Sequence, residues 1–497
     1  MPPRVRLFTA AVVFSCAAAP TIVRGQDVAA GKERIRSWIT GQLGAPPALM
    51  PSMAIAVVHG DVIVWEEAFG RADQQRRIAA TPTTPYSLVS VTKAFTGSAL
   101  VLLADEGRLD MNRSVNTYLG SDKVRPGLWD ANAITVQRVA NQMSGLTTFD
   151  LGCESASPCQ LESVIGRFGI IVRPPGELFD YSNLNYGILG AVIAQASKET
   201  YAAYLRRAIF NPLGMRDCGI APDDRASRVA IRYDIGTTRG TELRYSAAPG
   251  ASGGYCSAHS LALFARALLN QRPAPGARRW STLLPSKGIE TGPGLPAGLM
   301  YSHGWWIQPD YVGTPSIEAS GGTRNSSALV RIIPAERFAV IVLVNSAADV
   351  AHVADVIVDE FIPAIRERWK NWTPPAPVAR QRRPASPELE GTWVGSIETY
   401  RGTRALTISI DASGEVTGTL AGATAAVRLT GGGASGPRVF GTLPEADLGI
   451  DEARAGSYDV RLGLAMYGPR LAGFATTAAR PGSSAPPLSF LVALTRR

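Results

Sequence analysis

The chain has 497 residues, of which 45% are hydrophobic and 18% are charged. This length predicts two or three domains, and the composition is that of a globular protein with ample core, which excludes a disordered chain. The formal net charge is +9, but the basic residues are scattered and form no basic helix or basic–aromatic stripe. We therefore expect no nucleic-acid partner.

The N-terminus is typical of an export signal. Arg4 and Arg6 precede an apolar run over residues 7–19 that is too short to span a bilayer. We expect a signal peptide over residues 1–25 and a periplasmic or secreted bacterial protein. A lipoprotein anchor at Cys16 is the less favoured alternative, and no later segment is long and apolar enough for an integral membrane span.

Four cysteines remain beyond this signal, and in an exported chain they allow three disulfide pairings. Proximity favours Cys153–Cys159, which leaves Cys218–Cys256. Because no group of cysteines and histidines has the spacing of a zinc site, we expect no metal and no other cofactor.

The first elements in chain order are a helix over residues 28–43 and a hairpin of strands over 53–58 and 62–69, with a turn at His59. A helix is then predicted from Ser90 to about residue 106.

Ser90 and Lys93 lie three residues apart at the start of that helix, so their side chains share one face. A serine hydroxyl becomes a good nucleophile when a neighbouring base takes its proton, and lysine can be that base when burial or another cation lowers its pKa. The chain has six lysines, and only Lys93 has a serine three positions before it. The spacing therefore predicts a nucleophile and its base.

A second motif follows an amphipathic stretch over residues 134–143 and precedes an apolar helix expected over 186–195. Tyr181 and Asn183 are two residues apart, which points both side chains the same way in an extended segment or turn. Beside a lysine ammonium a phenolate is favoured and can relay a proton. Asparagine can hold both the lysine and a substrate amide. The alternative is a core tyrosine before a helix cap.

A competing nucleophile is Ser252, because Gly250–Gly254 fits the pattern Gly-x-Ser-x-Gly. The nucleophile elbow of an α/β-hydrolase needs a strand directly before this pattern and a helix directly after it. The preceding Ala247-Ala248-Pro249 is a poor strand, so we favour Ser90. The candidate partners of Ser252 are His259, His303 and His352, which we expect to be ordinary helix or pocket residues. Of these, His303 directly precedes Gly304–Trp306 and could line the cleft.

Paired strands are predicted over residues 327–333 and 338–345, with a helix over about 350–369. A proline- and arginine-rich linker over 373–388 then marks a domain boundary. Short alternating strands over 389–497 predict a small antiparallel barrel.

The first two motifs together resemble the serine β-lactamase and penicillin-binding-protein superfamily, whose signature includes Ser-x-x-Lys. The tyrosine in the second motif is similar to the branch of class C β-lactamases, D-aminopeptidases, DD-carboxypeptidases and esterases. Further likenesses lie at Asn141–Leu146, Pro175–Gly187, Asn211–Met215 and Gly304–Trp306. The resemblance implies an α+β fold over residues 26–372, with an antiparallel sheet flanked by helices and an all-helical lobe. The opening Gly391–Trp393 is similar to that of lipocalins.

The resemblance also implies a mechanism. Ser90 attacks a carbonyl, Lys93 and Tyr181 move the proton to the leaving group, and Asn183 positions the lysine and the substrate. Water then releases the acyl group.

The third motif departs from the family pattern of Lys, His or Trp, any residue, then Gly. The aligned residues are Ala319, Ser320 and Gly321. Alanine can neither bind a substrate carboxylate nor tune the tyrosine, which favours amides or esters other than β-lactams. We expect Ser320, Gly321 and Gly322 to bind substrate, with Gly322 as an oxyanion donor. Arg324 could supply the missing charge but is expected to be a surface residue.

We thus predict an exported serine hydrolase that acts through an acyl-enzyme on Ser90, with a small amide, peptide or ester as its substrate. The alternatives are a non-catalytic penicillin-binding-type sensor on the same fold and an α/β-hydrolase esterase that uses Ser252.

Overall fold

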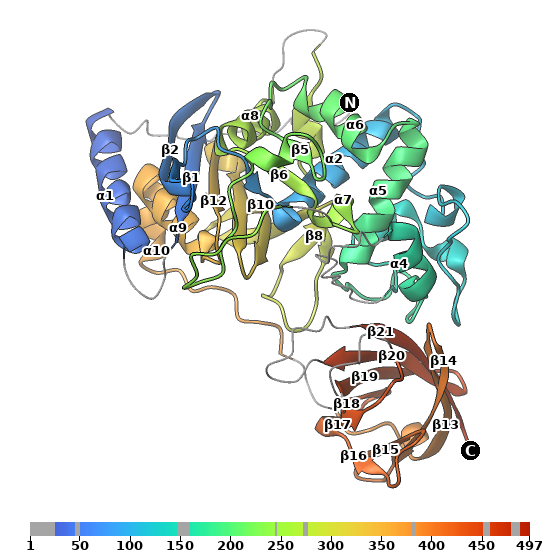
Figure 1. Ribbon diagram of the computed structural model, residues 1–497. Coiled ribbons are helices and arrows are strands. Elements are labelled where there is room, and N and C mark those ends of the chain that lie inside the picture. The colour runs from blue at the N-terminus through green and yellow to red at the C-terminus, as the bar shows by residue number, and fades with distance from the viewer. Residues whose placement is uncertain are drawn as a thin grey trace, which may run out of the picture.

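The computed structural model describes residues 25–44, 50–146, 160–243, 246–271, 277–379, 383–450, 458–478 and 488–497. A larger body of helices and strands is followed by a smaller body of strands at the C-terminal end (Figure 1). Residues 1–24 of the expected signal peptide, and the expected Cys153–Cys159 pair, lie outside the described residues. Among the helices of the described ranges, none is long and apolar enough to cross a membrane.

A nine-stranded antiparallel sheet forms the centre of the larger body, in the order β3-β2-β1-β12-β11-β10-β9-β8-β7. The hairpin predicted around His59 is present, and its first strand also pairs with β12 from the far end of the domain. The strands are β1 (Ser52–His59), β2 (Val62–Asp73), β3 (Ile78–Ala79), β7 (Ile289–Glu290), β8 (Met300–Ser302), β9 (Trp305–Tyr311), β10 (Thr314–Thr323), β11 (Ser326–Ile333) and β12 (Phe338–Val344).

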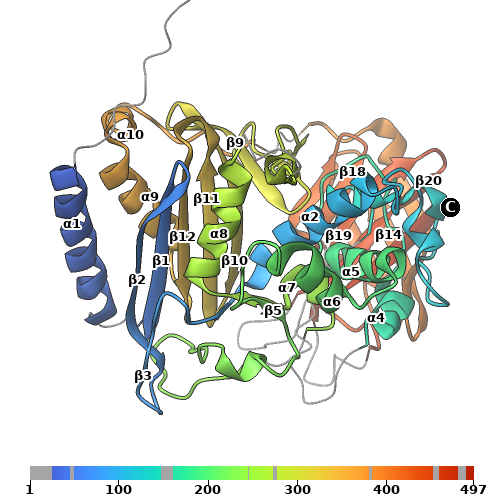
Figure 2. The same cartoon turned by 90° about the horizontal axis from the view of Figure 1, so that it is seen from above.

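Helices cover both faces of this sheet, so its central strands are buried on both sides. In β1, Ala56 joins one apolar cluster and its neighbour Val57 joins the other, as strand alternation requires. The first face packs against α8 (Ala258–Leu269). The second packs against α9 (Val350–Phe361), which α1 (Gly25–Gly44) and α10 (Pro363–Trp369) flank (Figure 2).

The single helix predicted over residues 350–369 is wrong, because the structure has two helices there. The helix α9 ends at Phe361, and α10 begins at Pro363. Proline lacks a backbone N–H and its ring clashes with the carbonyl four residues earlier, so it ends one helix and suits the first turn of the next.

A lobe of helices lies beside the sheet, on the side away from α1 (Figures 1 and 2). Its apolar centre contains α2 (Thr92–Asp105) and α5 (Asn183–Ser197). The predicted Cys218–Cys256 disulfide is present, and it joins the residue directly before β5 to the last residue of β6 in a small three-stranded sheet. The remaining elements of this region are α3 (Val136–Ala140), α4 (Leu161–Phe168), α6 (Tyr201–Leu205), α7 (Pro249–Ser252), β4 (Tyr86–Ser87), β5 (Gly219–Ile220) and β6 (Gly254–Cys256).

The smaller body is a nearly closed antiparallel sheet of nine strands, in the order β16-β15-β14-β13-β21-β20-β19-β18-β17. Leu406, Ile408 and Ile410 alternate with polar residues and are buried, as in a barrel filled by side chains. The small C-terminal barrel predicted from the sequence is thus confirmed. Its strands are β13 (Gly391–Thr399), β14 (Gly402–Ile410), β15 (Val416–Leu420), β16 (Val427–Arg428), β17 (Thr430–Ser435), β18 (Arg438–Ala446), β19 (Tyr458–Tyr467), β20 (Arg470–Ala478) and β21 (Ser489–Arg496).

Candidate active site

Ser90 lies in a tight 3₁₀ turn, η1 (Val89–Val91), that leads directly into α2. Val89 has a φ of +47°, which is strained for a β-branched residue and costs on the order of 1–3 kcal/mol. Contacts from Thr92 stabilise the turn, because its hydroxyl donates to the Val89 carbonyl at 2.7 Å and accepts from the Gly254 N–H at 3.0 Å. The surrounding structure therefore fixes the backbone that carries Ser90.

Lys93 is buried, with 1% of its surface exposed. Its Nζ lies 2.9 Å from Ser90 Oγ, 2.7 Å from Asn183 Oδ1 and 3.1 Å from the Ala251 carbonyl. An ammonium can donate to all three oxygens, whereas a neutral amine can accept the Ser90 proton across the same 2.9 Å, which is within the range for general-base catalysis. The structure thus brings Ser90, Lys93 and Asn183 together although the third comes from a distant helix.

Tyr181 lies beside the same lysine. The Nζ of Lys93 is 4.8 Å from the centroid of the Tyr181 ring, within the range of a cation–π interaction. The Trp306 ring also stacks on the Tyr181 ring, with centroids 5.8 Å apart. Phe179 and Tyr301 also pack against Trp306, at 5.9 and 4.9 Å.

Sequence reasoning missed this aromatic cluster of Phe179, Tyr181, Tyr301 and Trp306. The available signal was the doublet of Trp305 and Trp306 at the start of β9, because neighbouring residues of a strand point to opposite faces. Trp305 packs into the core against Phe264, and Trp306 packs against Tyr181.

A buried network of hydrogen bonds holds the backbone of the second motif, Tyr181–Asn183. The Gln142 side-chain oxygen accepts from the Ser182 N–H at 3.1 Å and from Asn185 Nδ2 at 2.6 Å. The Asn185 oxygen in turn accepts from Ser144 Oγ at 2.8 Å. These bonds fix the backbone between Tyr181 and the start of α5. Apart from the resemblance at Asn141–Leu146, no sequence pattern predicts them.

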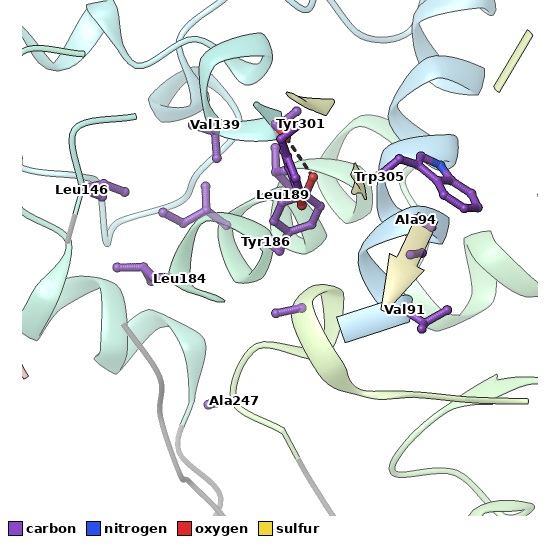
Figure 3. Close-up of a cluster of buried hydrophobic side chains, with 14 of the residues drawn as sticks. Val91, Ala94, Val139, Leu146, Leu184, Tyr186, Leu189, Ala247, Tyr301 and Trp305 are labelled. Carbon is purple, nitrogen blue, oxygen red and sulfur yellow. Dashed lines mark hydrogen bonds between the residues drawn. The ribbon is translucent and has the colours of Figure 1, made fainter. Parts of the chain in front are cut away.

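The floor of the site is apolar and tightly packed. Tyr186 and Tyr301 lie together near Leu189, and the same cluster includes Val91 at the end of η1 and Ala94 in α2 (Figure 3). Tyr186 is fixed further by donating to the Ala140 carbonyl at 2.8 Å. Burial raises the pKa of both tyrosines well above the ordinary value, so they remain neutral.

The third motif lies on β10, next to the Ser90 turn. A Cβ added to Gly321 would lie 2.5 Å from the Ser90 nitrogen and 2.7 Å from the Leu88 carbonyl oxygen, so glycine permits this close approach. Ala319 is buried and offers no charge, while Ser320 and Gly322 flank Gly321 on the strand.

Arg324 lies just beyond β10 and is 72% exposed, with its Nε 3.3 Å from Asp234 Oδ1. This arginine is a surface residue, as expected.

The α/β-hydrolase alternative is wrong. Ser252 ends the short helix α7 and β6 follows it, which is the reverse of the strand–elbow–helix order that alternative requires. The central sheet is also antiparallel, whereas that fold has a mostly parallel one. Ser252 Oγ lies 3.1 Å from Ser246 Oγ.

The three histidines considered above have separate surroundings. His259 Nδ1 lies 2.8 Å from Glu66 Oε2, and His352 packs against Trp38. His303 lies between β8 and β9, where burial lowers its pKa to about 4. In the part of the chain that the structure describes, no group of three or more His, Cys, Asp or Glu residues is placed to hold a metal ion.

The chain has similarities to known proteins in sequence. The family model for Beta-lactamase matches residues 45–360. Protein flp of Staphylococcus aureus (strain N315) is 27% identical over 310 residues, which are 60% of this chain and 60% of that protein. The putative penicillin-binding protein PbpX of Bacillus subtilis (strain 168) is 32% identical over 163 residues, which are 33% of this chain and 40% of that protein.

Two solved structures share the fold. The octameric penicillin-binding protein homologue from Pyrococcus abyssi has a TM-score of 0.57 at 18% identity, covering 93% of this chain and 100% of that one. The class C beta lactamase from Rhodobacter sphaeroides has a TM-score of 0.54 at 22% identity, covering 69% of this chain and 100% of that one. Since the family model covers well over half of the 497 residues, this protein belongs to the beta-lactamase family.

Proposed function

We propose that this protein is a serine hydrolase that cleaves a small amide, peptide or ester through an acyl-enzyme on Ser90. The observation that carries the proposal is the 2.9 Å contact between Ser90 Oγ and the Nζ of the buried Lys93. A serine, an amine within hydrogen-bonding reach and a third group that orients the amine form the arrangement of an activated nucleophile. Asn183 is that third group.

In the proposed reaction, Ser90 Oγ bonds to the substrate carbonyl carbon as its proton passes to Lys93 Nζ. The oxyanion that forms is stabilised by backbone N–H groups, for which the Ser90 turn and the adjacent end of β10 supply the candidates, including that of Gly322. Tyr181 relays the proton to the leaving group, whose bond to the carbonyl carbon then breaks. Water attacks the acyl-enzyme and restores the Ser90 hydroxyl.

We further propose that the substrate group next to β10 carries no carboxylate. Ala319 has no charge to offer, and Arg324 is paired with Asp234 at the surface. The neighbouring side chains Phe179 and Trp306 are aromatic, which suits an uncharged, largely apolar group. This favours neutral esters and amides over substrates whose recognition depends on a carboxylate.

An extracytoplasmic location is part of the proposal. The N-terminal sequence pattern and the Cys218–Cys256 disulfide both support it, because structural disulfides persist in oxidising compartments.

The second candidate function is a non-catalytic penicillin-binding-type sensor on the same fold, and the altered third motif is the feature that favours it.

One experiment separates the two functions. Purified protein is treated with a fluorophosphonate or a β-lactam, and the adduct is mapped by mass spectrometry, with Ser90→Ala and Ser252→Ala as matched controls. Hydrolysis of neutral esters with a fluorophosphonate adduct on Ser90 supports the enzyme. A β-lactam adduct on Ser90 with no turnover of any ester or amide supports the sensor. Labelling or hydrolysis that survives in Ser90→Ala contradicts both.

A further inference from the structure

The C-terminal barrel contacts the segment that leads into the second motif. This segment, Arg173–Asp180, is called the lead segment below, and it ends directly before Tyr181. The Arg173 guanidinium lies over the Phe474 ring of β20 at 4.6 Å, and it also pairs with the Asp180 carboxylate. A barrel side chain therefore supports the arginine that ties the two ends of the lead segment together.

A second contact is made in the middle of the lead segment, at Glu177. The Tyr467 hydroxyl of β19 donates to Glu177 Oε2 at 3.3 Å, and Arg438 Nη2 of β18 lies 3.9 Å from the other carboxylate oxygen. Burial, followed by the charge of Glu177, raises the pKa of Tyr467 to about 12, so this phenol remains a donor at neutral pH. The Tyr467 ring packs edge-on against Trp129 of the larger body at 5.3 Å.

The larger body holds the lead segment at different positions. The Gly176 N–H donates to the Met143 carbonyl at 2.7 Å, and the Asp180 N–H donates to the Gln142 carbonyl at 2.8 Å. Gln142 also binds the Ser182 N–H, just beyond Tyr181. Barrel contacts at Arg173 and Glu177 thus alternate with contacts from the larger body, and the segment is fixed from both sides.

We propose that the C-terminal barrel positions Tyr181 for catalysis by holding the lead segment, with Tyr467 and Phe474 as positioning residues. The inference rests on the proposed function, because it assigns the barrel a part in the same reaction. The rate of proton transfer falls steeply when the transferring side chain is displaced, whereas substrate binding also depends on contacts with other groups. Loosening the barrel contacts therefore lowers kcat more than it raises KM.

The test compares two full-length variants. Tyr467→Phe combined with Phe474→Leu removes the hydroxyl and the aromatic platform but keeps most of the apolar volume. The matched control is Glu398→Gln, which removes a 2.8 Å ion pair with Arg125 across the same interface without touching the lead segment. The readouts are hydrogen–deuterium exchange over residues 173–183 and the kcat, KM and pH profile of kcat for a neutral ester.

In the double variant we expect faster exchange over residues 173–183 and a roughly tenfold lower kcat, equivalent to about 1.4 kcal/mol. We also expect an altered pH profile of kcat and little change in KM. Glu398→Gln should match the wild type in every readout. Exchange and kcat that are unchanged in the double variant, or changed equally in the control, overturn the inference. Failure of the proposed function is recognised separately, by full hydrolysis in Ser90→Ala, while exchange still reports whether the barrel holds the segment.

Discussion

The ring of Trp306 is stacked on the ring of Tyr181, with the ring planes inclined by only 10°. The Lys93 ammonium lies over the same tyrosine ring. An aromatic ring and a cation thus both contact the ring of the proposed proton relay. Trp306 is therefore the first residue to test.

Replacing Trp306 by alanine should lower kcat for a neutral ester by roughly tenfold, because an aromatic pair contributes about 0.5–1.5 kcal/mol beyond its buried area. Trp306→Phe should retain most of the activity. The control is Trp305→Phe, which perturbs the core against Phe264 and should lower the melting temperature while leaving kcat nearly intact. Equal kcat in Trp306→Ala and the wild type would show that the stack has no role in the reaction.

Gly321 and Gly322 form a matched pair on β10. A Cβ at Gly321 would meet the Ser90 nitrogen and the Leu88 carbonyl, whereas a Cβ at Gly322 would have nothing within 4 Å. Gly321→Ala should displace β10 from the Ser90 turn and reduce fluorophosphonate labelling of Ser90 on the order of 100-fold, the cost of misplacing a reacting group by about 1 Å. Gly322→Ala keeps its backbone N–H and should be labelled nearly normally. Similar labelling of both variants contradicts the close approach.

Ala319 allows a gain-of-function test. Ala319→Lys should lower KM for a carboxylate-bearing β-lactam or peptide by roughly tenfold, through a charge-assisted hydrogen bond. It should not lower KM for a neutral ester. Because Ala319 is buried, the added bulk should cost about 1–3 kcal/mol of unfolding free energy. Ala319→Leu controls for that bulk, and a KM for the carboxylate substrate that falls equally in both variants would reject the charge argument.

His303 should make folding stability depend on pH. Burial lowers its pKa from 6.5 to about 4, so the unfolded chain binds the proton more readily between these values. Above about pH 6.5 the histidine is neutral in both the folded and the unfolded chain, and the free energy of unfolding has its full value. As the pH falls from about 6.5 to about 4, the unfolded chain takes up the proton first, and the free energy of unfolding decreases. The total loss should be at most about 3 kcal/mol.

Urea unfolding of the wild type and His303→Asn between pH 7 and 4 measures this loss. Asparagine suits the φ of +46° at this position. The wild type should lose more stability than the variant over this range, whereas His352→Gln, at an exposed position of α9, should follow the wild type. Parallel curves for the wild type and His303→Asn would contradict the prediction.

The sequence alone determined what depends on the local backbone. The spacing of Ser90 and Lys93 puts their side chains within one turn of a helix, and the alternation in 406–410 predicts a filled barrel. Pro363 marks the break between α9 and α10, although the pattern over 350–369 predicted a single helix. These features follow from backbone periodicity, so a few neighbouring residues suffice to predict them. The Gly250–Gly254 motif shows the limit of such local patterns, because it occurs without the preceding strand and the following helix that the nucleophile elbow of an α/β-hydrolase needs.

Only the tertiary structure decided which distant segments meet at Ser90. Asn183 reaches Lys93, Trp306 stacks on Tyr181, Gly321 approaches the Ser90 nitrogen, and Tyr467 reaches Glu177 across a domain interface. Each of these contacts depends on how helices and sheets pack over the whole molecule. No local periodicity encodes that packing, because it depends on the summed burial and fit of many side chains far apart in the chain.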